Sequence, residues 1–251
     1  MPNLSESPVV LITGAARRIG ACLAKRLHEC GFRIIVHYHH SLNEANSLCE
    51  ELNNRRHDSA WAVSADMTDI ASVEALASAS VSHWGRLDAL INNASSFYRT
   101  PLPDANKQQW GELIGSNLQG PFFLCQAVSE ELIMRRGAII NITDIHAHQP
   151  LARHSIYCIA KAGNTMLTRT MAKELAPHVR VNGIAPGVIL WPENNYSENI
   201  GEIKNNKLPA IPLKRMGTPE DIALLAEFLI TDASYITGQI ITVDGGKHLI
   251  F

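Results

Sequence analysis

The sequence has little net charge and no cluster of basic residues. Lys and Arg number 22 against 24 Asp and Glu in 251 residues, which gives a formal net charge of −2 and a pI of about 6.6. Nucleic-acid-binding domains usually carry a basic patch or stripe, so no nucleic-acid partner is expected. Apolar residues make up 46% of the chain, a composition that supports a full hydrophobic core and argues against disorder.

Long apolar runs, a secretory leader and paired cysteines are lacking as well. No apolar stretch approaches the roughly 20 residues that span a bilayer. The residues up to Pro8 have neither a basic start nor an apolar core, unlike a signal peptide. The five cysteines form no Cys-x-x-Cys pair, which fits reduced thiols better than a disulfide framework. We therefore expect a cytoplasmic protein with no membrane partner.

The chain alternates short apolar runs with longer segments of helical periodicity, and it shows no repeat or linker. This alternation predicts a single α/β domain over residues 1–251, with one doubly wound parallel sheet of about seven strands and helices on both faces. The expected strands are Val9–Ile12, Ile34–Val36, Trp61–Val63, Leu87–Ile91, Ala138–Ile142, Val179–Ile184 and Gln239–Val243.

The segment from about 188 to 213 breaks this rhythm with several prolines and Trp191. A loop of this length in a compact domain is usually functional or mobile. In doubly wound folds, ligands bind beyond the carboxyl ends of the strands. We therefore interpret the segment as a flap over the site and expect Trp191 to contact the substrate.

The first expected strand runs directly into Thr13-Gly-Ala-Ala-Arg-Arg-Ile-Gly20. Gly14 permits a tight turn, and Gly20 lets the following helix pack closely on the strand. The N–H groups at that helix start can bind a pyrophosphate. This is the dinucleotide-binding arrangement of a Rossmann fold, with Gly14, Arg18, Ile19 and Gly20 as cofactor contacts; an ordinary strand-to-helix turn is the alternative.

The second expected strand ends in Val36-His-Tyr-His-His-Ser41, without an acidic residue. An acid at that place would bond the ribose 2′-hydroxyl of NAD and repel a 2′-phosphate. Ser41, His40 and Arg18 can instead surround a 2′-phosphate, since arginine offers a forked pair of donors. With His39 also counted as a cofactor contact, the sequence predicts NADPH.

A metal site formed by the histidines of this strand is an alternative. His37 and His39 share a strand face, but no cysteine or carboxylate joins them at metal-ligand spacing. No metal is therefore expected. Asp66, just after the third expected strand, is expected to accept a hydrogen bond from the adenine amino group.

Tyr157 and Lys161 lie four residues apart in a segment that favours a helix from after Pro150 to about Ala176. This spacing puts both side chains on one helix face, with Cβ atoms roughly 5–6 Å apart. A nearby ammonium favours the phenolate and lowers the pKa of a tyrosine. We predict that Lys161 activates Tyr157 in this way and can also hold the nicotinamide ribose. A surface lysine beside a core tyrosine is the alternative.

Together these stretches resemble the short-chain dehydrogenase/reductase family along the whole chain. The matching stretches are Thr13–Gly20, Asn92-Asn-Ala-Ser95, Asn117 in Gly-Ser-Asn-Leu, Tyr157 with Lys161, Pro186-Gly187, Ile236-Thr-Gly-Gln239 and Val243-Asp-Gly-Gly246. The resemblance implies that Asn117 holds a water linked to Lys161, and that Asn92 stabilises the strand-four turn beside the cofactor. It also implies further cofactor contacts at Ala94, Pro186 and Gly187.

The resemblance further implies a homotetramer. The expected interface is formed by a helix from about Gln108 to Arg136 together with the helix that carries Tyr157.

One departure from the family is informative about the substrate. Most members place a serine thirteen residues before the tyrosine, where this chain has Asp144. An ionised carboxylate only accepts hydrogen bonds. It suits a ring N–H, an amino group or a proton-donating water better than a ketone oxygen. In the alternative reading, Asp144 only caps a turn and Thr143 takes the role of the serine.

Within the family, the sequence is most similar to pteridine reductases. These share the Asp at the same spacing, the Arg in the phosphate turn, and the run Asn93-Ala-Ser-Ser-Phe-Tyr98 followed by Thr100-Pro-Leu102. The resemblance implies that Phe97 stacks on a pterin, and that Ser95 and Arg18 touch pterin or cofactor phosphate. A flat heteroaromatic ring suits an aromatic face, although Phe97 could instead pack in the core.

Pteridine reductases usually have an Arg where this chain has His40. Because a histidine changes charge near neutral pH, binding of the 2′-phosphate by His40 would depend on pH.

The implied reaction is hydride transfer from NADPH to a pterin ring carbon, which turns a dihydropterin, or a dihydrofolate, into its tetrahydro form. Either Tyr157 or a water polarised by Asp144 protonates the adjacent ring nitrogen. Two alternatives remain at this point. One is a general carbonyl reductase, for example of 3-oxoacyl thioesters; the other is an NADP-binding sensor without turnover.

Overall fold

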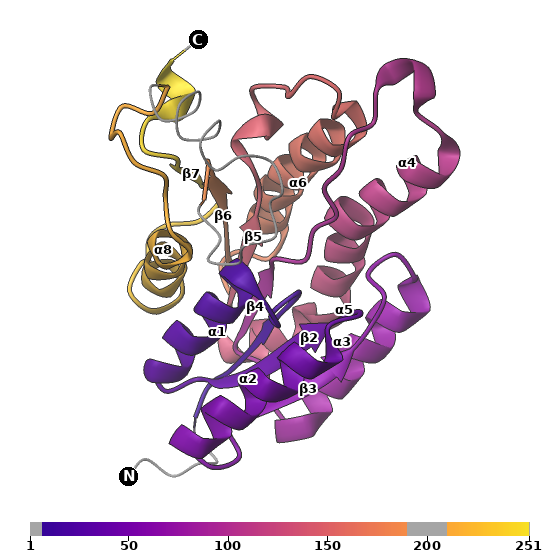
Figure 1. Cartoon of the computed structure of the whole chain (residues 1–251). Coiled ribbons are helices and arrows are strands. Elements are labelled where there is room, and N and C mark those ends of the chain that lie inside the picture. Colours follow the sequence, from indigo (N-terminus) through magenta and orange to yellow (C-terminus); the bar gives the residue numbers. More distant parts are fainter. Residues whose placement is uncertain (1–6, 190–209, 251) are drawn as a thin grey trace.

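The computed structural model describes residues 7–189 and 210–250 (Figure 1). Within these ranges lies a seven-stranded parallel sheet with strand order β3-β2-β1-β4-β5-β6-β7, so the doubly wound α/β fold is confirmed. All seven expected strands are present, although several begin or end at other residues. They are β1 Val9–Ile12, β2 Arg33–Tyr38, β3 Ala60–Ser64, β4 Ala89–Asn92, β5 Ala138–Ile142, β6 Arg180–Pro186 and β7 Ile240–Val243.

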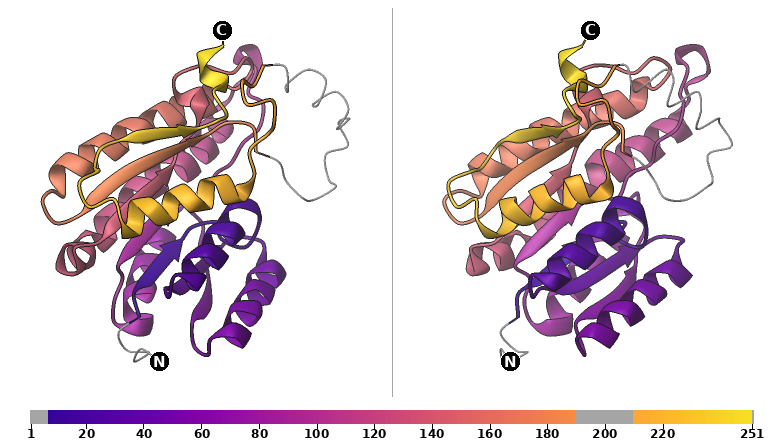
Figure 2. Two further views of the ribbon diagram at one scale, coloured as in Figure 1. Left: turned by 90° about the vertical axis from the view of Figure 1, so that its left-hand side faces the viewer. Right: turned by 60° about the vertical axis from the view of Figure 1, so that its left-hand side comes forward.

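Helices cover both faces of the sheet (Figure 2). One face carries α1 Arg18–Glu29, α2 Leu42–Arg55 and α8 Pro219–Thr231, and the other carries α3 Ile70–Trp84, α5 Gly120–Arg135 and α6 Ser155–Glu174. Helix α4 Lys107–Ile114 packs against α6. The shorter turns are 3-10 helices η2 Leu102–Asp104, η4 Ile145–Ala147 and η5 Lys247–Leu249, and the π-helix η3 Gly115–Gln119.

The first strand shows why its apolar run is continuous. Val10 and Ile12 belong to the core shared with α1, α2 and α8, whereas Val9 and Leu11 belong to the core shared with α3, α5 and α6. All four side chains are fully buried. Successive side chains of a strand point to opposite faces, so a strand covered on both faces must be apolar throughout.

Two helices differ from the sequence-based expectation. The single helix expected from Gln108 to Arg136 is interrupted by η3, a π turn that contains Asn117. Such turns often occur at functional sites. The helix that carries Tyr157, α6, begins at Ser155 rather than directly after Pro150, because Arg153 has a left-handed backbone with φ 66°.

Most of the expected flap lies outside the described residues. Trp191 belongs to the stretch 190–209, which the structure does not describe. At its near end, Val188 accepts a hydrogen bond from the Gly217 amide at 3.0 Å. Across residues 7–189 and 210–250, no helix is long and apolar enough to cross a membrane.

Candidate active site

The sequence-predicted site residues follow the carboxyl ends of β1, β2, β3, β4, β5 and β6. Because all the strands are parallel, these ends meet at one edge of the sheet. This is the edge at which doubly wound folds bind their ligands.

The turn after β1 has the form of a phosphate cradle. Gly14 has a φ of 62°, and a Cβ at this position would lie 3.0 Å from the Cα of Ala94. Helix α1 follows with Arg17 as its N-cap, and no side chain of the described residues caps it. By contrast, Asp69 caps α3 by accepting from the Ala71 amide at 3.1 Å. The amides at the start of α1 therefore fit an anionic pyrophosphate.

Arg18 occupies this turn in a strained conformation. Its φ is 56°, in the left-handed region where glycine is favoured and other residues lose about 1 kcal/mol. The side chain is exposed, and the neighbouring Arg17 pairs with Glu44 of α2 at 3.6 Å. A strained residue in a binding turn suggests a function for its side chain.

At the end of β2, one histidine is buried and the next two are exposed. His37 is 1% exposed, whereas His39 and His40 are exposed and their rings stack with centroids 3.6 Å apart. Ser41 is the N-cap of α2, yet among the described residues its side chain makes no capping hydrogen bond. His39, His40 and Ser41 therefore form an outward-facing polar cluster that can receive a phosphate.

Asp66 lies beside this cluster, two residues after the end of β3. Its Oδ1 accepts from the Thr68 amide at 2.8 Å, and its Oδ2 is 3.8 Å from Nε2 of His39. The Thr68 amide is the main cause that lowers the pKa of Asp66. The carboxylate is thus ionised and suited to accept a hydrogen bond from an adenine amino group.

The turn after β4 is held by Asn93 rather than by Asn92. The Nδ2 of Asn93 donates to the carbonyls of Thr13 at 2.8 Å and Gly14 at 3.0 Å. The Ala94 amide donates to the Thr13 hydroxyl at 3.0 Å. Asn92 faces the core instead, where its Nδ2 donates to Oδ1 of Asn141 at 2.8 Å. The prediction that Asn92 stabilises this turn is therefore wrong for its side chain.

Asp144 and Tyr157 form the centre of the site. The Tyr157 hydroxyl donates to Oδ2 of Asp144 at 2.6 Å, while Oδ1 of Asp144 accepts from the His146 amide at 2.8 Å. The Thr143 hydroxyl donates to the Ile184 carbonyl at 2.9 Å, and Thr143 is buried. The alternative in which Thr143 replaces the serine is therefore wrong, because Asp144 both caps η4 and contacts the tyrosine.

The electrostatics of this pair differ from the sequence-based expectation. Burial, and then the Asp144 carboxylate, raises the pKa of Tyr157 well above its usual value. Nζ of Lys161 donates to the Ile142 carbonyl at 2.9 Å and lies 5.8 Å from the centroid of the tyrosine ring. Burial lowers the pKa of Lys161 to about 8. The predicted lowering of the Tyr157 pKa by Lys161 is wrong here, and the tyrosine is a protonated donor.

Asn117 links Ser95 to a buried polar network. Its Oδ1 accepts from the Ser95 hydroxyl at 2.6 Å, and its Nδ2 donates to the Ser96 carbonyl at 3.0 Å. The Asn117 carbonyl accepts from Nδ2 of Asn164 at 3.0 Å. The network continues through Thr168 and Asn141 to Asn92. Asn164 was not among the predicted site residues, although a polar residue on a buried helix face is a usable signal. The implied water between Asn117 and Lys161 stays a prediction.

Phe97 is presented to solvent rather than packed in the core. It is 53% exposed, and its ring stacks on that of His154 with centroids 4.8 Å apart and planes 10° from parallel. The Phe97 ring also meets the Tyr157 ring edge-on, with centroids 4.8 Å apart. His154, which the sequence analysis missed, is the N-cap of α6. The Thr100 amide, which donates to the Arg153 carbonyl at 2.6 Å, ties the two segments together.

The end of β6 brings Pro186 and Gly187, two of the predicted cofactor contacts, to this edge of the sheet. Pro186 is the last residue of β6 and pairs with Val243. The Gly187 amide donates to the Val243 carbonyl at 3.0 Å, and a Cβ at Gly187 would clash with Asp244. Close packing here leaves only a glycine possible at position 187.

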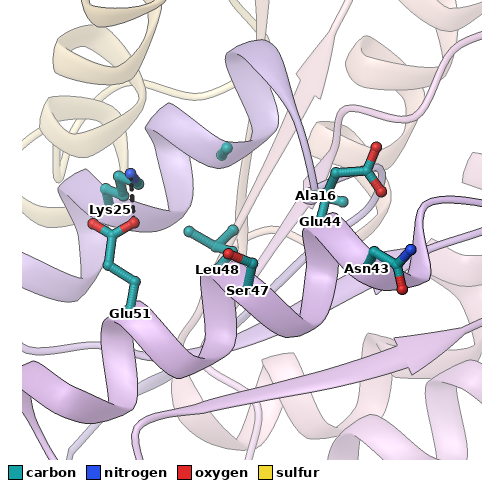
Figure 3. Close-up of a pocket in the computed structure, with 8 residues that line it drawn as sticks. Ala16, Lys25, Asn43, Glu44, Ser47, Leu48 and Glu51 are labelled. Atoms are coloured by element: carbon teal, nitrogen blue, oxygen red, sulfur yellow. Dashed lines mark ion pairs between the residues drawn. The ribbon is translucent and has the colours of Figure 1, made fainter.

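A separate depression of about 370 Å³ lies between α1 and α2 and is lined by none of the predicted site residues (Figure 3). The ion pair between Lys25 and Glu51, with an N–O distance of 2.7 Å, crosses it. The hydrogen-bonded pair of Asp144 and Tyr157 lies elsewhere, after β5 and in α6.

Comparison with known proteins agrees with this geometry. The sequence pattern of a family described as Enoyl-(Acyl carrier protein) reductase matches residues 14–248. The chain belongs to the short-chain dehydrogenase/reductase family. It is therefore an oxidoreductase that uses NAD(P).

Two relatives of this reductase carry different substrate names. Pteridine reductase 1 of Leishmania tarentolae is 35% identical over 99% of both chains. A 3-oxoacyl-(acyl-carrier-protein) reductase of Staphylococcus epidermidis is 37% identical, over 95% of this chain and 98% of the relative. Since the two identities are nearly equal, the substrate class is argued from the site.

Proposed function

We propose that the protein is an NADPH-dependent pteridine reductase that reduces dihydropterins, and also dihydrofolate, to their tetrahydro forms. The observation that carries this proposal is the carboxylate of Asp144, held in a 2.6 Å hydrogen bond from Tyr157. It stands where the family usually has a serine hydroxyl. The exposed ring of Phe97, edge-on to the same tyrosine, supports a flat aromatic substrate.

The chemistry of Asp144 favours a pterin over a ketone. A ketone oxygen needs a hydrogen-bond donor, whereas an ionised carboxylate offers only acceptors. A pterin presents ring N–H and amino groups, which are donors. The same carboxylate would repel the negative charge that develops on a ketone oxygen during reduction, so it disfavours a 3-oxoacyl thioester.

The cofactor side supports NADPH. The residues that would hold it are the amides at the start of α1, Arg18 in the turn, His40 and Ser41 for the 2′-phosphate, and Asp66 for the adenine. No acidic residue stands at the end of β2, where one would repel the additional phosphate. When bound, NADPH supplies the hydride.

The side chains of this chain would orient the substrate and deliver the proton. Phe97 provides a face for the pterin ring, and Asp144 accepts from a ring N–H or amino group. Tyr157, whose raised pKa keeps it protonated, donates its hydroxyl proton to the ring nitrogen beside the reduced carbon. Lys161, with its pKa of about 8, holds a positive charge nearby for the tyrosinate that results.

The test is NADPH oxidation by the purified protein, with dihydrobiopterin, dihydromonapterin and a 3-oxoacyl thioester offered separately. We expect turnover on the pterins alone. Asp144→Ser should lose most pterin turnover and gain turnover on the thioester, while Asp144→Asn, of the same shape, should lose the first without gaining the second. Turnover of the wild type on the thioester alone would overturn the proposal, and silence on all three would favour a sensor.

We further propose a homotetramer. Trp110 of α4, Phe122 of α5, and Ile159 and Met166 of α6 are between 39% and 55% exposed. Helix α4 packs against α6, and large apolar side chains exposed on neighbouring helices are typical of interfaces. Light scattering should give the mass of four chains, and Met166→Lys should lower it.

A further inference from the structure

His37 has an unusual place in the cofactor half of the molecule. It lies in β2, is 1% exposed, and uses both ring nitrogens. Its Nδ1 lies 3.0 Å from the amide nitrogen of Gly14, and its Nε2 lies 3.1 Å from the carbonyl oxygen of Ala65. One buried side chain thus joins the turn after β1 to the segment after β3.

The two partners determine the tautomer of this ring. The Gly14 amide can only donate, so Nδ1 must be the unprotonated acceptor. The Ala65 carbonyl can only accept, so Nε2 must carry the proton. The neutral ring therefore satisfies both partners, whereas an imidazolium would lose the bond from Gly14. Burial lowers the pKa of His37 to about 4, which keeps the ring neutral.

The two segments joined by His37 serve two different parts of the proposed dinucleotide site. Gly14 forms the turn for the pyrophosphate, and Ala65 precedes Asp66 on the adenine side. Main-chain bonds reinforce the arrangement, because the His37 carbonyl accepts from the Ala15 amide at 2.9 Å and the Tyr38 carbonyl accepts from the Ala65 amide at 3.1 Å. The distance between the Gly14 turn and the segment that begins at Ala65 therefore depends on His37.

We propose that His37 is a positioning residue for dinucleotide binding, which sets the Gly14 turn and the Asp66 segment before the cofactor arrives. The proposal rests on the NAD(P) dependence of the proposed function but not on its substrate. Without the side chain, the turn would have to be ordered during binding, and affinity would fall by that ordering.

The proposal predicts how two cofactors respond. The pyrophosphate and adenine are common to NADH and NADPH, so loss of a positioning residue weakens both by the same factor. Loss of His40, which faces the 2′-phosphate in the proposed function, weakens NADPH alone. Comparing the two cofactors therefore separates positioning from phosphate contact.

The experiment measures the Kd of both cofactors by calorimetry, and thermal unfolding without cofactor, for His37→Leu, His37→Asn and His37→Gln. His37→Leu removes both bonds and should weaken both cofactors by about tenfold or more, the value of one or two hydrogen bonds. His37→Asn retains an acceptor near Nδ1 and should recover most of the affinity. His37→Gln, which can reach only the Ala65 side, should not.

His40→Asn is the matched control and should weaken NADPH alone. Should the leucine variant fail to fold, the contrast between Asn and Gln still tests the proposal. Equal affinity of those two variants, an unchanged Kd with a lower Tm, or a loss confined to NADPH would each overturn it. Because no pterin is used, the result is independent of the substrate assignment.

Discussion

Lys161 is required by the proposed chemistry but should destabilise the fold. It is 3% exposed, and burial lowers its pKa from 10.5 to about 8. Each pH unit of such a difference corresponds to about 1.4 kcal/mol, so the charged lysine costs the native state about 3 kcal/mol at neutral pH. Replacing it with methionine, which has a similar shape, removes this cost.

The replacement also has an unfavourable part. Nζ of Lys161 donates to the Ile142 carbonyl at 2.9 Å, and leaving a buried carbonyl without that donor costs about 1–2 kcal/mol. The net expectation for Lys161→Met is a free energy of unfolding about 1–2 kcal/mol above that of the wild type at neutral pH, together with loss of most turnover.

The pH dependence has a definite sign. Below pH 8 the lysine is charged in both states, and the full penalty is present. Between about pH 8 and 10.5 the unfolded chain keeps a proton that the native state has released, so the stability of the wild type rises with pH relative to the variant. The advantage of Lys161→Met should therefore shrink across this window, vanish part-way through it, and reverse near its upper end, where only the lost hydrogen bond to the Ile142 carbonyl remains.

The assay is urea unfolding of the cofactor-free protein near neutrality and at about pH 10, at one fixed protein concentration. Lys173→Met is the control, because Lys173 is exposed on the same helix and its replacement should change little at either pH. If Lys161→Met is destabilising near neutrality, or if its difference from the wild type does not depend on pH, the reasoning from burial is refuted.

Three further predictions concern the two halves of the site. Arg18→Gly should relieve the left-handed backbone, so that the unfolding free energy changes by no more than about 1 kcal/mol while NADPH titration shows weaker binding; a larger loss of stability would make the arginine structural. His154→Leu should raise the pterin KM by up to about tenfold, since it removes the ring that supports Phe97, and leave the Kd for NADPH unchanged; a change in the Kd alone would contradict this. As pH falls from 6.5 to about 4, His37 binds a proton in the unfolded chain but stays neutral in the buried native state. The free energy of unfolding of the wild type should therefore decline by up to about 3 kcal/mol across this range. His37→Asn should make this decline smaller in unfolding measured at acid pH, and an equal pH dependence in the two proteins would refute the assignment.

Local patterns in the sequence determined the fold and the type of chemistry. The continuous apolar runs and the helical segments between them favour a parallel sheet covered on both faces, because that arrangement buries both sides of each strand. The glycine turn after the first strand and the spacing of Tyr157 and Lys161 are short-range features, so they survive into the structure unchanged. Asp144 is equally local, and its carboxylate, at the position where most of the family has a serine, is the basis of the proposed pterin substrate.

Tertiary structure decided which way the polar side chains face. The sequence puts His37 and His39 on one strand face, yet β2 ends at Tyr38, so only His37 is buried. Likewise, His154 lies far from Phe97 in the chain, and the two rings meet because Thr100 forms a β-bridge with His154. The raised pKa of Tyr157 has the same origin, since burial depends on every element that packs around a group. Sequence periodicity predicts which side chains share a face of one helix or strand, whereas contacts between elements depend on how all of them pack together.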